Sequence, residues 1–333
     1  MEPTVMLAAT ASAPVGLGQV SVTMALVGLV VGLGVLAGGA ELLVRGAASI
    51  GLRAGLRPII IGLTVVALGT SSPELVVSVT AAFHGDTDVS VGNVVGSNVF
   101  NILAILGFAA IVRPMSIRSQ TIRYEMPMMI AISLVMFFMA YDGRISRSDG
   151  AILLLTFAVF LVYCYMFARM PEFEKPPAPT RSHAASIMLA ILGIGGLAGG
   201  GHLCVTNAVT LAEAMGVSKL VIGLTVLAFG TSLPELAASV AAAIRQQEDL
   251  SVGNVVGSNI FNIGLVLGLT ALICREGLPV SRDCLRYDIP ISVGVSVLVL
   301  PLMWSRQTLA RIEGTVLVTG ILAYTVFRYA IEL

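Results

Sequence analysis

Charged side chains are scarce in this sequence. Only 11% of its 333 residues are Asp, Glu, Lys or Arg, and 56% are hydrophobic, whereas a soluble domain carries about 25% charged residues. Acidic and basic residues balance at 19 each, so no basic surface for nucleic acid is indicated. The four cysteines include no C-x-x-C pair, which argues against a zinc ribbon or a redox motif. This composition predicts an integral membrane protein whose main partner is the lipid bilayer, with no obligate protein partner indicated.

Ten apolar runs approach the length of a transmembrane helix, about 20 residues. They are continuous rather than alternating, which excludes a transmembrane β-barrel. The runs fall at about 20–44, 57–83, 89–112, 125–141, 150–168, 184–213, 218–244, 250–273, 287–304 and 310–330. The sequence therefore predicts an all-α, multi-pass membrane protein with ten spans. It leaves no room for a soluble catalytic domain, so neither an enzyme nor a bound cofactor is expected.

A long internal repeat divides the chain into two halves. Residues 62–107 read GLTVVALGTSSPELVVSVTAAFHGDTDVSVGNVVGSNVFNILAILG, and residues 223–268 read GLTVLAFGTSLPELAASVAAAIRQQEDLSVGNVVGSNIFNIGLVLG. At a shift of 161 positions, 30 of these 46 residues are identical. Five spans separate a residue from its copy, so the copy enters the membrane from the opposite side. Two inverted five-helix repeats are typical of secondary transporters, whose ion sites lie near the bilayer midplane.

The domain boundaries and the orientation follow from the polar segments. We expect an N-terminal tail at 1–19, a first repeat at 20–168, a proline-rich cytoplasmic linker at 169–183 and a second repeat at 184–333. The tail lacks the Lys and Arg of a signal peptide. With both termini outside, twelve of the 19 basic residues face the cytoplasm, as the positive-inside rule prefers. The compact loops fit a prokaryotic inner membrane.

A proline interrupts one predicted span of each half immediately before a glutamate. The segments are Gly69-Thr70-Ser71-Ser72-Pro73-Glu74 and Gly230-Thr231-Ser232-Leu233-Pro234-Glu235. Proline removes a helical hydrogen bond and bends the helix, and broken backbone at membrane depth persists only where it is buried or lines a wet cavity. We therefore expect broken helices at the midplane, with oxygen ligands from the carbonyls of Ala67, Thr70, Ala228 and Thr231.

Glu74 and Glu235 are the strongest candidates for ion ligands. A charge at membrane depth costs from about 3 to over 10 kcal/mol, and such residues are usually functional. No Lys or Arg lies near either glutamate within its own motif, so a local salt bridge is not available. If the repeats bring the two carboxylates together, they repel, and a divalent cation would relieve both at once.

A second motif adds neutral oxygens. Ser97 and Asn101 are four residues apart, as are Ser258 and Asn262, so each pair shares one helix face. Thr70, Ser71 and their copies Thr231 and Ser232 supply further hydroxyls. The remaining asparagines of the motif are interpreted as caps of broken helix segments; these are Asn93, Asn98, Asn254 and Asn259. With no His or Cys, the set disfavours zinc, copper and iron; it suits calcium, which takes 6–8 oxygens, or sodium, which is similar in size.

The paired GTS-x-PE and GN-x-x-GSN-x-FN segments resemble the alpha repeats of the calcium/cation antiporter superfamily, in particular its prokaryotic sodium/calcium exchangers. The resemblance implies exchange of several sodium ions for one calcium ion by alternating access. It implies that Glu74 and Glu235, completed by the carbonyls of Thr70 and Thr231, bind calcium. Flanking sodium sites would use the Ala67 and Ala228 carbonyls with the hydroxyls of Ser71, Ser97, Ser232 and Ser258. Asn101 and Asn262 would line the centre, and Asn at both positions resembles the potassium-independent pattern.

Three alternatives stay open at the level of sequence. The same glutamates could exchange protons for calcium or another divalent cation. The spans could form a cation channel. A hydrolase built on Ser71 or Ser232 with His202 is the weakest alternative, because His202 has no copy in the other half and no G-x-S-x-G motif is present.

Overall fold

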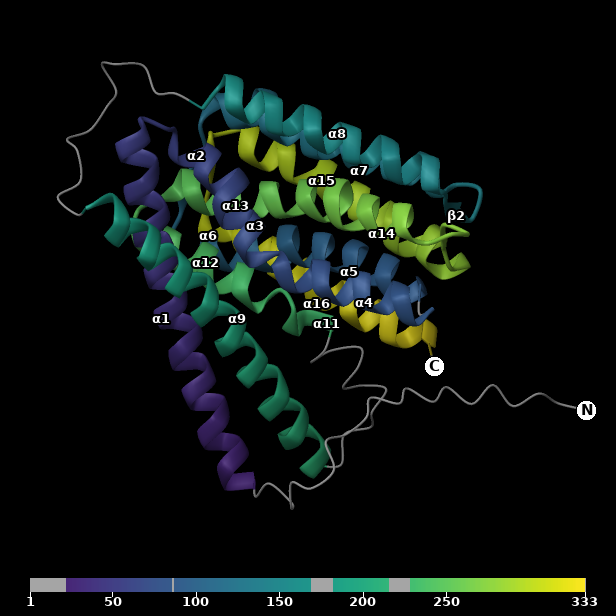
Figure 1. Cartoon of the computed structure of the whole chain (residues 1–333), viewed down its shortest axis with the longest axis horizontal. Coiled ribbons are helices and arrows are strands. Elements are labelled where there is room, and N and C mark those ends of the chain that lie inside the picture. The colour runs from purple at the N-terminus through teal and green to yellow at the C-terminus, as the bar shows by residue number, and fades with distance from the viewer. Residues whose placement is uncertain (1–21, 86, 169–181, 216–227, 333) are drawn as a thin grey trace, which may run out of the picture.

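The protein is helical apart from four short strands in the part of the chain that the structure describes. The computed structural model describes residues 22–85, 87–168, 182–215 and 228–332 (Figure 1). The first half contains α1 (Val22–Ala54), α2 (Pro58–Ile61), η1 (Gly62–Val66), α3 (Ala67–Thr70), α4 (Ser72–His84), α5 (Thr87–Phe100), η2 (Asn101–Leu106), α6 (Gly107–Val112), β1 (Met115–Ser116), η3 (Thr121–Glu125), α7 (Met126–Ala140), β2 (Arg144–Ile145) and α8 (Arg147–Met166). The second half contains α9 (His183–Ala214), α11 (Ala228–Gly230), α12 (Leu233–Ile244), α13 (Glu248–Phe261), η6 (Asn262–Leu267), α14 (Gly268–Ile273), β3 (Leu278–Pro279), η7 (Cys284–Asp288), α15 (Ile289–Trp304), β4 (Thr308–Leu309) and α16 (Arg311–Glu332).

Most of the expected spans are present as helices. Among the described residues, eight helices are long and apolar enough to cross a membrane, and the bent pair Pro58–Thr70 and Ser72–His84 makes a ninth. The tenth expected span, 218–244, is described only from residue 228 onward, where Leu233–Ile244 forms a shorter apolar helix. The helical membrane protein is therefore confirmed, and ten spans stay a prediction. The tail at 1–19 lies outside the described residues, as does most of the linker at 169–183.

The first helix is longer than its apolar run suggested. The run was expected to end near residue 44, but α1 continues to Ala54. Glu41 and Arg45 interrupt the apolar pattern, yet they are four residues apart and form an ion pair with an O–N distance of 2.5 Å. Because neighbours at this spacing lie on one helix face and stabilise it, two charges that end a hydropathy run do not end the helix.

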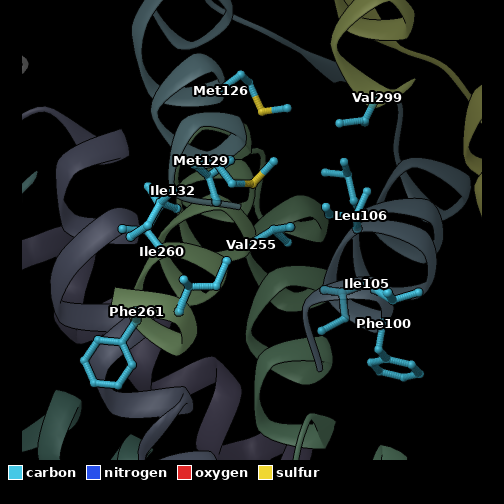
Figure 2. Packing of buried hydrophobic residues seen from close by; sticks show 14 of the residues in the cluster. Phe100, Ile105, Leu106, Met126, Met129, Ile132, Val255, Ile260, Phe261 and Val299 are labelled. Atoms are coloured by element: carbon cyan, nitrogen blue, oxygen red, sulfur yellow. The ribbon is translucent and has the colours of Figure 1, made fainter. Parts of the chain in front are cut away.

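Two spans form the centre of the molecule. In the most apolar stretch of Ser90–Val112, 83% of the residues are buried, and in that of Glu248–Ile273 the share is 78%, against 22% for α1. Figure 2 shows the side chains that pack around these central spans, contributed by α5, η2, α7, α13 and α15; those labelled are Phe100, Ile105, Leu106, Met126, Met129, Ile132, Val255, Ile260, Phe261 and Val299. The GN-x-x-GSN-x-FN motif of each half therefore lies on one of these two enclosed helices.

Helix breaks occur where the prolines predicted them. The α-helical conformation stops at Ser71, with φ −84° and ψ 7°, and α3 and α4 meet at a bend of 46°. Ser232 has nearly the same conformation, with φ −88° and ψ 6°, directly before α12. Further irregular turns begin at Asn101 and Asn262, where the helix widens into the π-helical segments η2 and η6. Such π-helical turns occur frequently at functional sites.

Two small antiparallel strand pairs connect the halves at their loops. β1 pairs with β4 through Met115 opposite Leu309, and β2 pairs with β3 through Ile145 opposite Leu278. β1 and β3 follow equivalent helices in the two halves, yet neither pairs with the other. A long apolar helix separates β1 from β2, and another separates β3 from β4. The equivalent loops of the two halves therefore belong to different strand pairs.

A buried carboxyl at the last residue of each of the π-helical segments η3 and η7 is also duplicated. Tyr163 donates its hydroxyl to Glu125 Oε1 at 2.8 Å, and Tyr324 donates to Asp288 Oδ1 at 2.8 Å. The two tyrosines are 161 residues apart, the same shift that relates the motif segments. The repeat thus extends in three dimensions beyond the segments of high sequence identity.

The helices α1 and α9 form a pair that crosses the rest of the bundle obliquely (Figure 1). Glycines permit very close approach between them. A Cβ atom added at Gly39 would lie 2.6 Å from the backbone nitrogen of Leu197, and one added at Gly193 would lie 2.4 Å from that of Leu43. Since these neighbours are backbone atoms, they cannot swing away, and the interface depends on the missing side chains.

We expect Gly39→Val to separate α1 from α9 and Gly38→Val to leave them in place. A Cβ at Gly38 meets no described atom within 4 Å, so this neighbouring glycine is a matched control for the effect of valine on the helix itself. Overpacking at Gly39 should reduce the free energy of unfolding by about 1–3 kcal/mol. Thermal unfolding in detergent measures it, and equal losses for both variants would contradict the packing described.

Candidate functional site

The two glutamates occupy equivalent positions in the two halves. Glu74 lies in the first turn of α4 and Glu235 in the first turn of α12, each directly after a proline. Their exposed fractions are 0% and 1%. The N-terminus of a helix carries a partial positive charge, so this position favours a carboxylate. The proline breaks therefore place a helix N-terminus at each buried acid.

Hydrogen bonds from serines cross between the halves to reach these acids. Ser71 donates to Glu235 Oε1 at 2.8 Å, and Ser232 donates to Glu74 Oε1 at 3.1 Å. The same hydroxyls lie against the serines of the second motif: Ser71 Oγ is 2.9 Å from Ser258 Oγ, and Ser232 Oγ is 3.3 Å from Ser97 Oγ. The structure thus brings six of the predicted site residues into two equivalent groups, each of which joins the two halves; they are Ser71, Glu235 and Ser258, and Ser232, Glu74 and Ser97.

Several oxygens of the predicted site residues have no hydrogen-bond partner. The second carboxylate oxygens, Glu74 Oε2 and Glu235 Oε2, are buried and unpaired among the described residues, as are Asn101 Oδ1, Asn262 Oδ1 and Thr231 Oγ1. A buried acceptor without a partner costs about 1–3 kcal/mol, and more for a charged group. No ion pair in the described ranges involves either glutamate. Unpaired anionic and amide oxygens at one place are the ligands that a hard cation takes.

The donor chemistry argues against a transition metal. Nowhere in the described part of the chain do three or more His, Cys, Asp or Glu side chains gather closely enough to hold a metal ion. The predicted site residues offer two carboxylates, and their other side-chain donors are hydroxyls and amides. Sites of this kind suit calcium or sodium rather than zinc, copper or iron.

Four asparagines form a second crossed network beside the glutamates. Asn101 donates to Asn259 Oδ1 at 3.1 Å, and Asn262 donates to Asn98 Oδ1 at 3.2 Å. Each of these bonds joins one half to the other and uses the amide nitrogen. The arrangement leaves Asn101 Oδ1 and Asn262 Oδ1 as the unpaired atoms of their side chains.

The capping role predicted for the remaining asparagines is wrong. α5 continues through Asn93 and Asn98, and α13 continues through Asn254 and Asn259, so no helix begins at these residues. Asn98 instead accepts from Asn262, and Asn259 accepts from Asn101. Asn93 and Asn254 donate to the backbone carbonyls of the two glutamates. Gly257 of the same motif makes a close contact: an added Cβ would lie 2.6 Å from the carbonyl oxygen of Leu63.

The backbone carbonyls at the breaks differ between the halves. The Ala67 carbonyl accepts the Ser71 N–H at 2.9 Å, so one of its lone pairs is already used. In the second half the Ser232 N–H is 3.2 Å from the Phe229 carbonyl, one residue further along than the equivalent of Ala67. Ala228 begins α11 and Thr231 follows it within the same break. The two breaks therefore share a position but not a hydrogen-bond pattern.

Two serines at the site were not singled out from the sequence. Ser78 accepts from Asn93 at 2.9 Å, and Ser239 accepts from Asn254 at 2.8 Å. Both are identical in the two halves, which is the signal that could have identified them. His202, the candidate base of a hydrolase, is exposed, and none of the described hydrogen bonds connects it to Ser71 or Ser232.

Comparison with known proteins identifies relatives whose sequences match most of this chain. The family model described as sodium/calcium exchanger protein matches residues 24–166 and 185–330. The inner membrane protein YrbG of Escherichia coli is 40% identical over 304 residues, which cover 88% of this chain and 92% of YrbG. The putative antiporter CaxA of Alkalimonas amylolytica is 37% identical over 89% of this chain and 96% of its own length. The sodium/calcium exchanger MaX1 of Methanosarcina acetivorans is 28% identical over 91% and 98%.

A solved structure has the same fold. The sodium-calcium exchanger NCX_Mj, soaked with 10 mM Na+ and 10 mM Sr2+, superimposes with a TM-score of 0.80 at 30% sequence identity. The match covers 93% of this chain and 99% of that one. The similarity thus extends over both halves of the chain.

We expect Ser71→Ala to destabilise the protein in sodium- and calcium-free buffer, because it removes the donor to Glu235 Oε1 and leaves more of a buried carboxylate unbonded. The loss should be about 1–3 kcal/mol of unfolding free energy, measured by thermal unfolding. Ser72→Ala is the neighbouring control, since its hydroxyl donates to the Leu68 carbonyl of the adjoining helix α3, at 2.7 Å, and to neither glutamate among the described hydrogen bonds. A smaller loss for Ser71→Ala than for Ser72→Ala would contradict the crossed bond.

Proposed function

Because this chain belongs to the sodium/calcium exchanger protein family, we propose that it exchanges sodium for calcium as a secondary active antiporter. Alternating access would expose one ion site, between Glu74 and Glu235, to each side of the membrane in turn. One observation carries this proposal: two buried carboxylates, one from each half, each accept a serine hydroxyl from the opposite half and each keep an unpaired oxygen. A bound cation would provide a partner for both unpaired carboxylate oxygens.

Calcium is assigned to the two glutamates. Their unpaired oxygens and the carbonyls of Thr70 and Thr231 provide hard ligands without His or Cys, in the flexible geometry that calcium accepts and magnesium does not. Asn101 and Asn262 line the centre, where their Oδ1 atoms are unpaired. Sodium, which shares the preference for oxygen, takes flanking sites made by the Ala67 and Ala228 carbonyls with Ser71, Ser97, Ser232 and Ser258.

The proposed architecture has ten spans in two inverted repeats, at 20–168 and 184–333. The strand pairs support the inversion. β1 and β3 follow equivalent helices of the two halves, but β3 pairs with β2, which is separated from β1 by the long helix α7. β1 and β3 therefore lie at opposite ends of that helix. Inverted repeats allow one site to face either side by movement of one part of the protein against the other. With the linker cytoplasmic, both termini lie outside a prokaryotic inner membrane, in agreement with the relative YrbG being an inner membrane protein.

The coupling ion is the finer part of the proposal. MaX1 and NCX_Mj are sodium/calcium exchangers by name, which supports sodium. CaxA is described only as a putative antiporter. The alternative is exchange of protons for calcium or another divalent cation, because paired carboxylates without a metal can carry protons.

We expect Glu74→Gln and Glu235→Gln each to abolish sodium-gradient-driven calcium uptake into proteoliposomes, because each removes one of the two negative charges at the site. Glu125→Gln is the matched control: Glu125 is equally buried, but its oxygen accepts from Tyr163, outside the proposed ion site. It should retain uptake. Retained uptake in both site variants would refute the glutamate site, and uncoupled, non-saturating current in the wild type would indicate a channel.

The second expected result concerns the driving gradient. An outward sodium gradient should drive calcium uptake at equal pH on both sides, and a pH gradient without sodium should not, because sodium ions occupy the flanking oxygens. Flux of radioactive calcium measures both cases in the same vesicles. Uptake that follows the pH gradient and ignores sodium would replace this proposal by the proton alternative.

A further inference from the structure

Two asparagines at matching positions, Asn93 and Asn254, hold the backbone of the two glutamates. Asn93 Nδ2 donates to the Glu74 carbonyl at 3.3 Å, and Asn254 Nδ2 donates to the Glu235 carbonyl at the same distance. Each also donates to a serine one turn further along the glutamate's own helix, Ser78 or Ser239. Each asparagine therefore connects the second motif of its half to the glutamate of the same half.

Only one of the two asparagines also reaches across to the other half. The Thr70 hydroxyl shares its proton between Asn254 Oδ1, at 3.2 Å, and the Val66 carbonyl oxygen, at 3.1 Å. The copy of Thr70 is Thr231, and its hydroxyl oxygen is buried with no hydrogen bond to the described part of the chain. The two-fold pattern of the site is therefore broken at this one bond.

The extra bond closes a ring of contacts around Glu235. Ser71 donates to Glu235 Oε1, Thr70 is covalently joined to Ser71, Thr70 donates to Asn254, and Asn254 donates back to the Glu235 carbonyl. The side chain and the backbone of Glu235 are thus both tied to the break between α3 and α4. Around Glu74 the equivalent ring is open, because Thr231 and Asn93 are not bonded to each other.

We propose that Asn254 is a positioning residue that sets the distance between Glu235 and the Thr70–Ser71 break of the opposite half. It is not an ion ligand in this arrangement, because its oxygen accepts from Thr70 and its nitrogen is used by the Glu235 carbonyl and by Ser239. Glu235 is then the fixed carboxylate of the site and Glu74 the adaptable one. This inference rests on the proposed function, since calcium is taken as the ion that both carboxylates bind.

A double-mutant cycle tests the bond directly. Thr70→Val removes the hydroxyl and keeps the shape and the backbone carbonyl, and Asn254→Ala removes its acceptor. The readout is the apparent Kd for calcium, obtained from the calcium-dependent rise of the unfolding temperature in detergent. Thr70→Val should raise Kd about fivefold, the effect of one net hydrogen bond. Asn254→Ala should raise Kd at least as much, because it also removes the bonds from Nδ2 to the Glu235 carbonyl and to Ser239. The double variant should match the weaker-binding single variant rather than multiply the two effects.

Three comparisons make the test specific. Thr70→Ser, which keeps the hydroxyl, should recover most of the affinity that Thr70→Val loses. Thr231→Val should raise Kd less than Thr70→Val, and Thr70→Val with Asn93→Ala should multiply the two single effects. If Asn254→Ala does not fold, the contrast between Thr70→Val, Thr70→Ser and Thr231→Val decides alone.

The outcomes separate this inference from the proposed function. Multiplying effects in Thr70→Val with Asn254→Ala, or equal losses in Thr70→Val and Thr231→Val, would overturn the role of Asn254 while wild-type calcium binding stands. A wild-type protein whose unfolding temperature does not respond to calcium would overturn the proposed function, and this inference with it.

Discussion

The burial of two carboxylates, Glu74 and Glu235, is the constraint on which the rest of the structure depends. Glu74 and Glu235 have no basic partner among the described residues, so other devices must make their burial tolerable. Each acid lies at a helix N-terminus created by a proline, and each receives a serine hydroxyl from the opposite half. These devices stabilise one oxygen of each acid and leave the other available.

Because the two halves are copies, a few residue types build the surroundings of both glutamates. The halves contribute the same serines, asparagines and prolines, and the crossed bonds Ser71–Glu235 and Ser232–Glu74 arise from one interaction used twice. An interaction is also used twice outside the site, where Tyr163 and Tyr324 each donate a hydrogen bond to a buried carboxyl group. The contacts of the two halves are not all equivalent, however. The Thr70–Asn254 bond has no counterpart in the described structure, so the two glutamates have different surroundings although their motifs match.

The peripheral helices α1 and α9 differ from the central spans in burial and in the way they pack. The central spans are mostly buried, and their polar groups bond across the halves, whereas α1 exposes most of its apolar side chains as a lipid-facing helix does. Between α1 and α9, glycines such as Gly39 and Gly193 bring the two backbones into contact without interlocking side chains. Packing of this kind stabilises helix pairs in lipid, where burial of apolar surface gives no driving force.

The sequence by itself determined what local pattern and repetition can determine: helical spans, a break at each proline, the duplicated halves and the two glutamates as the exceptional charges. It misjudged α1, because hydropathy does not register that Glu41 and Arg45 neutralise each other on one helix face. It also misjudged Asn93, Asn98, Asn254 and Asn259 as caps. Only the tertiary structure decided which partners they have, and that Ser71 bonds Glu235 rather than the nearer Glu74. The crossed contacts join residues more than 150 positions apart, and those of Asn93 and Asn254 join residues 15 to 19 positions apart on different helices. No local pattern in the sequence selects such contacts, because the packing of one helix against another decides them.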